Sequence, residues 1–187
     1  SVYAFDMDND GDIDFLAAFE SYDTITWYEN DGNENFTSYV VTTAVNNPKS
    51  VYALDVDDDG DIDLLSASAN DDKIAWYQND GSENFTVHTI TTTANGASSV
   101  YAIDVDSDGD VDFLSASSYD DKIAWYENDG SEVFVAHTIT LSADGATSVH
   151  AMDMDDDGDI DLLSASSNDN KIAWYENDGS ENFTVHI

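Results

Sequence analysis

An alternating run of aspartates, Asp-X-Asp-X-Asp-Gly-Asp-X-Asp, occurs four times in this chain at constant spacing. The runs begin at Asp6, Asp55, Asp104 and Asp153, so the period is 49 residues. A fixed period of this length indicates a repeat architecture, in which similar units pack against their neighbours and bury a shared core. The period therefore limits the fold to an array of four similar units.

Each unit contains four short segments with the composition of β-strands, as the second unit illustrates. These segments are rich in Val, Ile, Tyr and Trp, and no segment carries an apolar stripe with helical spacing. The Asn-Asp-Gly sequence at 79–81 is typical of a hairpin turn, because glycine tolerates a positive φ. The expected strands of this unit are residues 50–54, 64–68, 73–77 and 85–90.

Four antiparallel strands in 49 residues match the size of one β-propeller blade. The first strand is apolar on both sides, with Val51 and Ala53 on one face and Tyr52 and Leu54 on the other. Such a strand belongs in a sheet that lies between two other sheets. We therefore predict an all-β propeller with four four-stranded antiparallel blades. A two-layer β-sandwich is the structural alternative, but it gives no reason for a strict period.

The chain as a whole, residues 1–187, is expected to be a single propeller domain or part of a larger one. It begins at a first strand and ends in a fourth strand, so neither terminus lends a strand to the other end. Two arrangements remain open: four blades that close on themselves, or a larger ring with more blades. The approximate blades are residues 1–49, 50–98, 99–147 and 148–187.

The aspartate runs have the ligand pattern of a calcium loop. Alternate side chains of a tight loop point inward, so the carboxylates at positions 1, 3 and 5 converge. The glycine at position 6 permits a sharp bend, position 7 offers its backbone carbonyl, and position 9 supplies a closing carboxylate. The predicted metal-binding residues are Asp6, Asp8, Asp10, Asp12, Asp14, Asp55, Asp57, Asp59, Asp61, Asp63, Asp104, Asp106, Asp108, Asp110, Asp112, Asp153, Asp155, Asp157, Asp159 and Asp161.

Only oxygen donors are present in these runs, which favours Ca²⁺, with about four ions at one per repeat. Zinc would require Cys or convergent His ligands, and Mg²⁺ prefers to keep its water molecules. An EF-hand is excluded because its twelfth position would be Ser66 instead of Glu, and because no helices flank the loop. We predict that each ion is structural and ties the first strand of a blade to the second.

The charge of the chain limits its partners. It has 41 acidic and only four basic residues, which give a formal net charge of −37. Phosphate groups are recognised by Lys and Arg, so nucleic acid and anionic membrane surfaces are excluded as partners. No cysteine is present, and no stretch is long and apolar enough for membrane insertion. Weak calcium sites fill outside cells and not in the cytosol, so we expect an extracellular location, secreted or at the cell surface.

The aspartate loops are followed by Lys-Ile-Ala-Trp-Tyr-Glu-Asn-Asp-Gly or a close variant, and together they resemble FG-GAP/VCBS-type repeats over essentially the whole chain. The resemblance implies a calcium-bearing β-propeller, of the kind found in integrin α-chains and in many secreted bacterial proteins. It also implies adhesion, ligand or glycan binding, or a place beside a catalytic domain. The Phe-Gly and Gly-Ala-Pro elements of the family name are absent, so the similarity is stronger to the bacterial branch.

The four tryptophans have two interpretations. Indole faces stack on sugar rings, which suggests glycan binding, and indoles also bury a large apolar area between sheets. Trp76 shares its strand face with Ile74, which favours packing between blades. The equivalent residues are Trp27, Trp76, Trp125 and Trp174.

No catalytic motif occurs in the chain: there is no G-x-S-x-G sequence, phosphate-binding glycine loop or H-E-x-x-H sequence. We therefore predict a secreted, non-catalytic calcium-binding propeller module that mediates adhesion or binds a protein or glycan ligand. The alternatives are an accessory or catalytic propeller domain of a secreted polysaccharide-degrading enzyme, and a structural spacer in a surface assembly. Self-association that completes a propeller ring is a further expectation.

Overall fold

The computed structural model describes residues 1–187 and contains sixteen β-strands and no helix. No segment therefore has the helical length and apolarity needed to cross a membrane. The strands are β1 (Val2–Phe5), β2 (Asp14–Phe19), β3 (Thr24–Asn30), β4 (Phe36–Thr42), β5 (Pro48–Leu54), β6 (Asp63–Ser68), β7 (Lys73–Asn79), β8 (Phe85–Thr91), β9 (Ala97–Ile103), β10 (Asp112–Ser117), β11 (Lys122–Asn128), β12 (Phe134–Thr140), β13 (Ala146–Met152), β14 (Asp161–Ser166), β15 (Lys171–Asn177) and β16 (Phe183–His186).

The strands form four separate antiparallel sheets of four strands each, and the strand order in every sheet follows the chain. We call these sheets blade 1 (β1–β4), blade 2 (β5–β8), blade 3 (β9–β12) and blade 4 (β13–β16). The predicted all-β fold with four-stranded propeller-like blades is confirmed. The four strands expected in the second unit lie within β5 to β8, each of which extends one or two residues further at one end.

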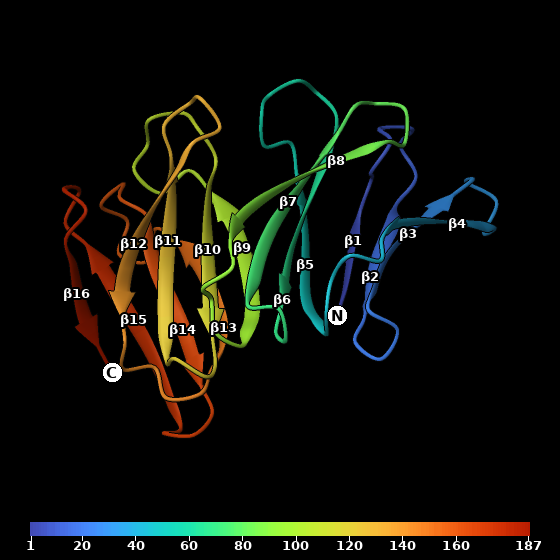
Figure 1. Ribbon diagram of the computed structural model, residues 1–187. Coiled ribbons are helices and arrows are strands. Elements are labelled where there is room, and N and C mark those ends of the chain that lie inside the picture. Colours follow the sequence, from blue (N-terminus) through green and yellow to red (C-terminus); the bar gives the residue numbers. More distant parts are fainter.

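The turns place the functional loops at one end of the blades. The aspartate runs connect the first strand of each blade to the second, and the Asn-Asp-Gly turns connect the third strand to the fourth. Figure 1 shows both kinds of connection at the upper end of blades 2 and 3. Gly81, in the turn of blade 2, has a φ of 70°, which glycine adopts without steric cost.

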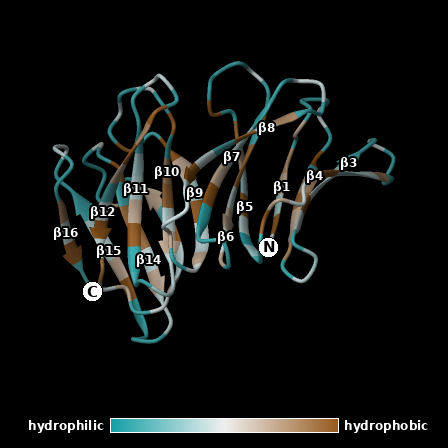
Figure 2. Cartoon of the chain, viewed as in Figure 1, coloured by the Kyte–Doolittle hydropathy of each residue, from teal (hydrophilic) through white to brown (hydrophobic).

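The core consists of three apolar clusters, one at each contact between successive blades. Each cluster joins the face that a blade turns toward the next blade, its forward face, to the rear face of that next blade. Figure 2 shows the apolar residues in the strands and the hydrophilic ones in the connecting loops. Between blades 2 and 3 the forward face is Val56, Leu65, Ala67, Ile74 and Trp76, and the rear face is Val100, Ala102, Phe113, Ala124 and Tyr126.

Strand register determines which residues share a face. β6 pairs with β7 so that Leu65 lies opposite Trp76 and Leu64 lies opposite Tyr77. Because side chains alternate along a strand, the first pair points to the forward face and the second to the rear face. An apolar residue at nearly every strand position is thus explained by burial on both sides of the sheet.

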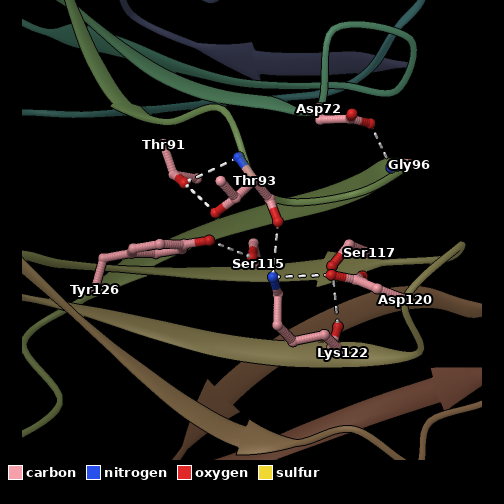
Figure 3. Close-up of polar contacts among 9 residues, drawn as sticks. All are labelled: Asp72, Thr91, Thr93, Gly96, Ser115, Ser117, Asp120, Lys122 and Tyr126. Carbon is pink, nitrogen blue, oxygen red and sulfur yellow. Dashed lines mark hydrogen bonds and ion pairs between the residues drawn. The ribbon is translucent and has the colours of Figure 1, made fainter.

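The linker between blades 2 and 3 is fixed to both of them (Figure 3). The Lys122 ammonium donates to the backbone carbonyl of Thr93 at 2.9 Å and forms an ion pair with Asp120, also at 2.9 Å. On the other side, the backbone N–H of Gly96 donates to the Asp72 carboxylate at 2.9 Å. Lys73 makes the equivalent bond to the backbone carbonyl of Ala44, so two of the four lysines hold a linker between successive blades.

The row of blades is open at both ends. Val2 in blade 1 and Ile172 in blade 4 are exposed, whereas the equivalent Val51 and Ile74 are buried. Figure 1 shows blade 1, in blue, and blade 4, in red, at opposite ends of the molecule. Of the two arrangements that the sequence left open, closure of four blades on themselves is therefore not found.

Candidate metal centres

The carboxylates at positions 1, 3 and 5 of each aspartate run come together in the structure. In every blade one carboxylate oxygen from each of the three aspartates lies within 4.8 Å of the other two, close enough to share one metal ion. Four such triads occur, one per repeat, as the sequence predicted for these positions. The triads are Asp6, Asp8 and Asp10; Asp55, Asp57 and Asp59; Asp104, Asp106 and Asp108; and Asp153, Asp155 and Asp157.

Backbone N–H groups hold the triad carboxylates in place. In blade 2 the Gly60 N–H donates to Asp55 Oδ2 at 3.0 Å, and the Asp61 N–H donates to Asp59 Oδ1 at 2.8 Å. Gly60 has a φ of 94°, which the bend requires and which other residues rarely adopt. The other three loops contain the same two hydrogen bonds. In blade 2 one oxygen of Asp55 and one of Asp59 are thus held by the backbone, whereas in blades 1 and 4 both oxygens of the position-1 aspartate accept backbone N–H bonds.

Several triad oxygens are buried without a hydrogen-bond partner: Asp55 Oδ1, Asp57 Oδ1 and Asp104 Oδ1. Burial and the neighbouring carboxylates of Asp59 and Asp57 raise the pKa of Asp55 above its ordinary value. Burial also raises the pKa of Asp106. A buried anionic oxygen without a partner is costly, and a cation at the centre of the triad would remove that cost. The donor set, all oxygen, fits Ca²⁺.

The aspartate at position 9 accepts hydrogen bonds from backbone N–H groups in two different segments of its blade. Asp63, in blade 2, is fully buried and accepts hydrogen bonds from the backbone N–H groups of Val56 at 3.1 Å and Asn79 at 2.8 Å. These bonds join the start of the loop to the end of β7. Burial raises the pKa of Asp63 to about 7, while the N–H donors act in the opposite direction. Its service as a closing ligand stays a prediction, as it does for the equivalent Asp14, Asp112 and Asp161.

The side chain at position 7 points away from the triad. In blade 2 the Asp61 carboxylate lies against Gly81, where an added Cβ would come within 2.5 Å of its Oδ2 atom. The positive φ favours glycine at this hairpin position, and the Asp61 carboxylate would have to move to admit a Cβ there. The backbone carbonyl of Asp61 remains the predicted ligand, and Asp12, Asp110 and Asp159 occupy the same position.

The sequence analysis missed a residue on the third strand that lies beside position 3 of the loop. In blade 2 this residue is Gln78, whose amide donates to Asp57 Oδ2 at 2.5 Å. In blade 3 it is Glu127, whose negative charge contributes to the raised pKa of Asp106. Glu29 and Glu176 hold the same place in blades 1 and 4. The sequence could have revealed this residue, because it recurs at the 49-residue period and is Glu in every blade except blade 2, where it is Gln.

The tryptophans belong to the contacts between blades. Trp76 is fully buried in the cluster between blades 2 and 3, and its ring stacks on His88 with centroids 4.4 Å apart. Trp27 and Trp125 are likewise buried. Packing between blades is thus confirmed for these three residues, and their indole faces are not available to stack on a sugar.

Three clefts recur at the contacts between blades, beside the aspartate loops. Each is bordered by the position-3 aspartate and the tryptophan of one blade, and by the hairpin glycine and glutamate of the next blade. Their volumes are about 360 Å³ between blades 1 and 2, 280 Å³ between blades 2 and 3, and 70 Å³ between blades 3 and 4. The hairpin glutamates that line them are Glu83, Glu132 and Glu181.

Three overlapping segments of the chain, residues 6–66, 55–115 and 104–164, match the profile of the FG-GAP-like repeat. Each segment starts at the first aspartate of one loop and continues through the loop of the next repeat. The match therefore covers most of the chain and includes every triad. No curated protein sequence matches the chain.

Solved structures share the fold at low sequence identity. The biofilm matrix protein Bap1 of V. cholerae is 18% identical with a TM-score of 0.64, over 98% of this chain and 27% of that chain. A protein from Lactobacillus plantarum is 15% identical with a TM-score of 0.60, over 91% and 50%. An exo-β-1,3-galactanase from Phanerochaete chrysosporium, solved with β-1,3-galactotriose, is 10% identical with a TM-score of 0.59, over 92% and 46%. The chain thus spans half or less of the length of these proteins.

Proposed function

Because the chain belongs to the FG-GAP-like repeat family, we propose that it is an extracellular, non-catalytic binding module whose four blades each hold a structural Ca²⁺ ion. The observation that carries the proposal is the position of three recurring clefts directly beside the carboxylate triads. A bound ion would fix the loop that forms one wall of each cleft. Ligand binding would then depend on calcium.

Calcium would act here by supplying positive charge where oxygen donors converge. Asp55, Asp57 and Asp59 would contribute carboxylates in blade 2, and the equivalent residues would do so in the other blades. With the loop fixed, the first and second strands of the blade are held together at their upper ends. Extracellular placement agrees with this role, because calcium modules outside cells work at weak affinity. The structural likeness to a biofilm matrix protein also supports this placement.

Calcium removal tests the metal part of the proposal. We expect excess EGTA to lower the melting temperature strongly, since four clusters of like charges would then be left without a counter-ion. CaCl₂ should restore the melting temperature, and equimolar MgCl₂ should do so only weakly. Titration calorimetry should show about four ions per chain. A melting curve that EGTA leaves unchanged would refute the structural role of the ion.

The chemistry of the clefts favours a neutral, hydroxyl-rich glycan as the ligand. The lining is polar and acidic, with Asp57, Asp110 and Glu132 around the cleft between blades 2 and 3. Glycan hydroxyls can donate hydrogen bonds to these carboxylates. The chain's net charge of −37 disfavours an anionic polysaccharide. Recurrence of the cleft along the row would allow several sugars of one chain to bind at once, which increases avidity.

A glycan array tests this choice with variants of the hairpin glutamates. Glu83→Gln, Glu132→Gln and Glu181→Gln together should lower binding to neutral glycans without a change in melting temperature. Glu34→Gln is the matched control, because Glu34 holds the same hairpin position in blade 1, where no preceding blade forms a cleft. Equal loss in the control, or a calcium-loaded protein that binds no neutral glycan, would contradict the proposal.

An enzymatic role on polysaccharides is the second candidate function, and the shared fold of the galactanase favours it. The expected result under our proposal is no release of sugar from β-1,3-galactan by the calcium-loaded chain. Release that is abolished by substitution of carboxylates in one cleft would favour the enzymatic role instead.

A further inference from the structure

The fourth strand of each blade lies at the outer edge of its sheet and pairs with the third strand only. In β8 and β12, whose blades have a neighbouring blade on both sides, no residue is buried. Yet the four outer strands contain no Asp, Glu, Lys or Arg, in a chain with 41 acidic residues. An edge strand leaves alternate backbone N–H and C=O groups unpaired, and proteins usually protect such an edge with charged side chains or proline. These outer edges are therefore open to pairing with another strand.

A bulge protects only one part of each edge. The register between β11 and β12 shifts between Ile123 and Ala124, so that Ile139 is the extra residue of a bulge. Strand β8 has the same shift, with Ile90 as the extra residue. A bulge bends an edge strand and ends regular pairing at that point. Residues 134–138 of β12 precede the bulge and keep a regular register with β11, so this segment is left for pairing.

A groove of about 530 Å³ follows this segment, between β12 and the hairpin that precedes β16. Residues 136–139 of β12 line one wall, and Glu181 and Phe183 of blade 4 line the other. Because the side chains of consecutive strand residues point to opposite faces, a groove that touches all four runs along the edge of the strand. Trp125 also lines the groove, and its ring stacks on His137 with centroids 4.7 Å apart. The open edge of β12 thus borders a space that can hold side chains.

The groove carries a negative charge that no lysine of the chain neutralises. Glu181 is exposed on its blade 4 wall. The chain has four lysines and no arginine, and each lysine is paired with an acidic residue elsewhere. A cationic side chain from outside could therefore donate a charge-assisted hydrogen bond to this carboxylate. A second copy of the chain would instead be repelled, because it also carries a formal charge of −37.

We propose that the outer edge of blade 3 binds an extended segment of another protein, which adds a fifth strand beside β12 and places a Lys or Arg side chain near Glu181. Backbone hydrogen bonds to residues 134–138 would provide affinity, and the groove would select the side chains at alternate positions. Trp125 and Phe183 offer apolar contact to the aliphatic stem of the basic side chain. The groove adjoins the cleft between blades 3 and 4 and shares Glu181 with it, but β12 lies outside that cleft.

Selection from a displayed library of random peptides on the immobilised, calcium-loaded protein tests the proposal. The enriched peptides should carry β-branched residues at alternate positions and at least one Lys or Arg. Proline placed within an enriched peptide should abolish its binding, because proline cannot donate a backbone hydrogen bond. A library that yields no binding peptide, or one that yields acidic or proline-rich peptides, would overturn the proposal.

Hydrogen exchange with an enriched peptide bound identifies the edge that it occupies. The amides of residues 134–138 should exchange more slowly than in the free protein, because the outward N–H groups become hydrogen-bonded. The equivalent residues 85–89 of β8 should be unaffected. Binding without protection of β12 would contradict strand addition, because contact through side chains alone leaves the outward N–H groups free.

Fluorescence anisotropy of a labelled, enriched peptide measures the effect of substitutions. Ala136→Lys puts a charge of the peptide's own sign at the edge, and Glu181→Gln removes the partner of the basic side chain. Each should weaken binding about tenfold or more, as loss of a charge-assisted hydrogen bond does. The matched controls are Val87→Lys, at the equivalent position of β8, and Glu34→Gln, at the equivalent hairpin position of blade 1.

The salt effect and the controls decide the outcome. NaCl should weaken binding, since it screens the attraction between the basic peptide and Glu181. Thermal melts show whether each variant is folded, and Glu181→Gln, a conservative exchange at an exposed position, keeps the test valid if Ala136→Lys does not fold. Equal loss of affinity in the matched controls, or unchanged affinity in Glu181→Gln, would overturn the proposal. Self-association of the protein without peptide, blocked by Ala136→Lys, would assign the edge to a second copy instead.

Discussion

The aspartate at position 3 of each loop lies next to a third-strand residue that varies between blades. In blade 2 it accepts a hydrogen bond from neutral Gln78, and in blade 3 it lies near the carboxylate of Glu127. The candidate metal centres therefore differ in local charge although their triads are the same. The affinity of a loop for Ca²⁺ should increase with the number of carboxylates beside it, because each additional negative charge attracts the cation.

Substitution of a single triad member should remove one ion. Asp57→Asn replaces a carboxylate at the centre of the blade 2 triad with a neutral amide, so titration calorimetry should count about one ion fewer per chain. Asp58→Asn is the control, since Asp58 is exposed, lies outside the triad and has a φ of 57°, which asparagine tolerates. An unchanged ion count for Asp57→Asn would exclude this triad as a centre.

Gln78→Glu should make blade 2 more dependent on calcium. The substitution removes the amide donor to Asp57 and adds a negative charge beside it. Like charges at this distance destabilise the metal-free loop, whereas a bound cation benefits from the extra charge. We expect a lower melting temperature in EGTA and a larger rise on addition of CaCl₂ than in the wild type. Equal melting curves for both proteins in EGTA would show that the residue does not act on the loop.

The packing of one blade on the next decides the cost of core substitutions. Trp76→Ala removes a fully buried indole from the contact between blades 2 and 3 and should lower the free energy of unfolding by about 3–5 kcal/mol. Trp174→Ala removes the equivalent indole from blade 4, where it is half-buried, and should lower the free energy of unfolding clearly less. Urea unfolding followed by circular dichroism measures both. Equal losses would mean that blade 4 is covered in solution.

The sequence of each repeat predicted its strands, but it did not predict whether a neighbouring blade covers them. The Lys-Ile-Ala-Trp-Tyr segment is the same in blades 2, 3 and 4, so its strand and its faces could be predicted. Yet Ile74 is buried and Ile172 exposed, because exposure depends on a neighbouring blade that the segment does not encode. The converging triads followed from the alternation of aspartates in a tight loop. The hydrogen bond that the Asn79 N–H donates to Asp63 did not, since it joins residues that only the folded sheet brings together.

For the molecule as a whole, the excess of negative charge makes stability depend on the surrounding electrolyte. Salt shortens the screening length from about 10 Å at 0.1 M to about 3 Å at 1 M, which weakens the repulsion among acidic loops. NaCl should therefore raise the melting temperature of the calcium-free protein more than that of the calcium-loaded protein. Differential scanning calorimetry in EGTA and in CaCl₂ over this salt range measures the difference. A larger effect of NaCl on the loaded protein would contradict this account.

Every sheet is completed within its own repeat, because strand order follows the chain and no strand passes from one blade to another. Duplication or deletion of one 49-residue unit in the gene would therefore leave every backbone hydrogen-bond ladder intact. Only the apolar contacts at the two junctions would have to re-form, and those junctions are alike. The chain can thus change length during evolution by whole blades, with little selection against the intermediate steps.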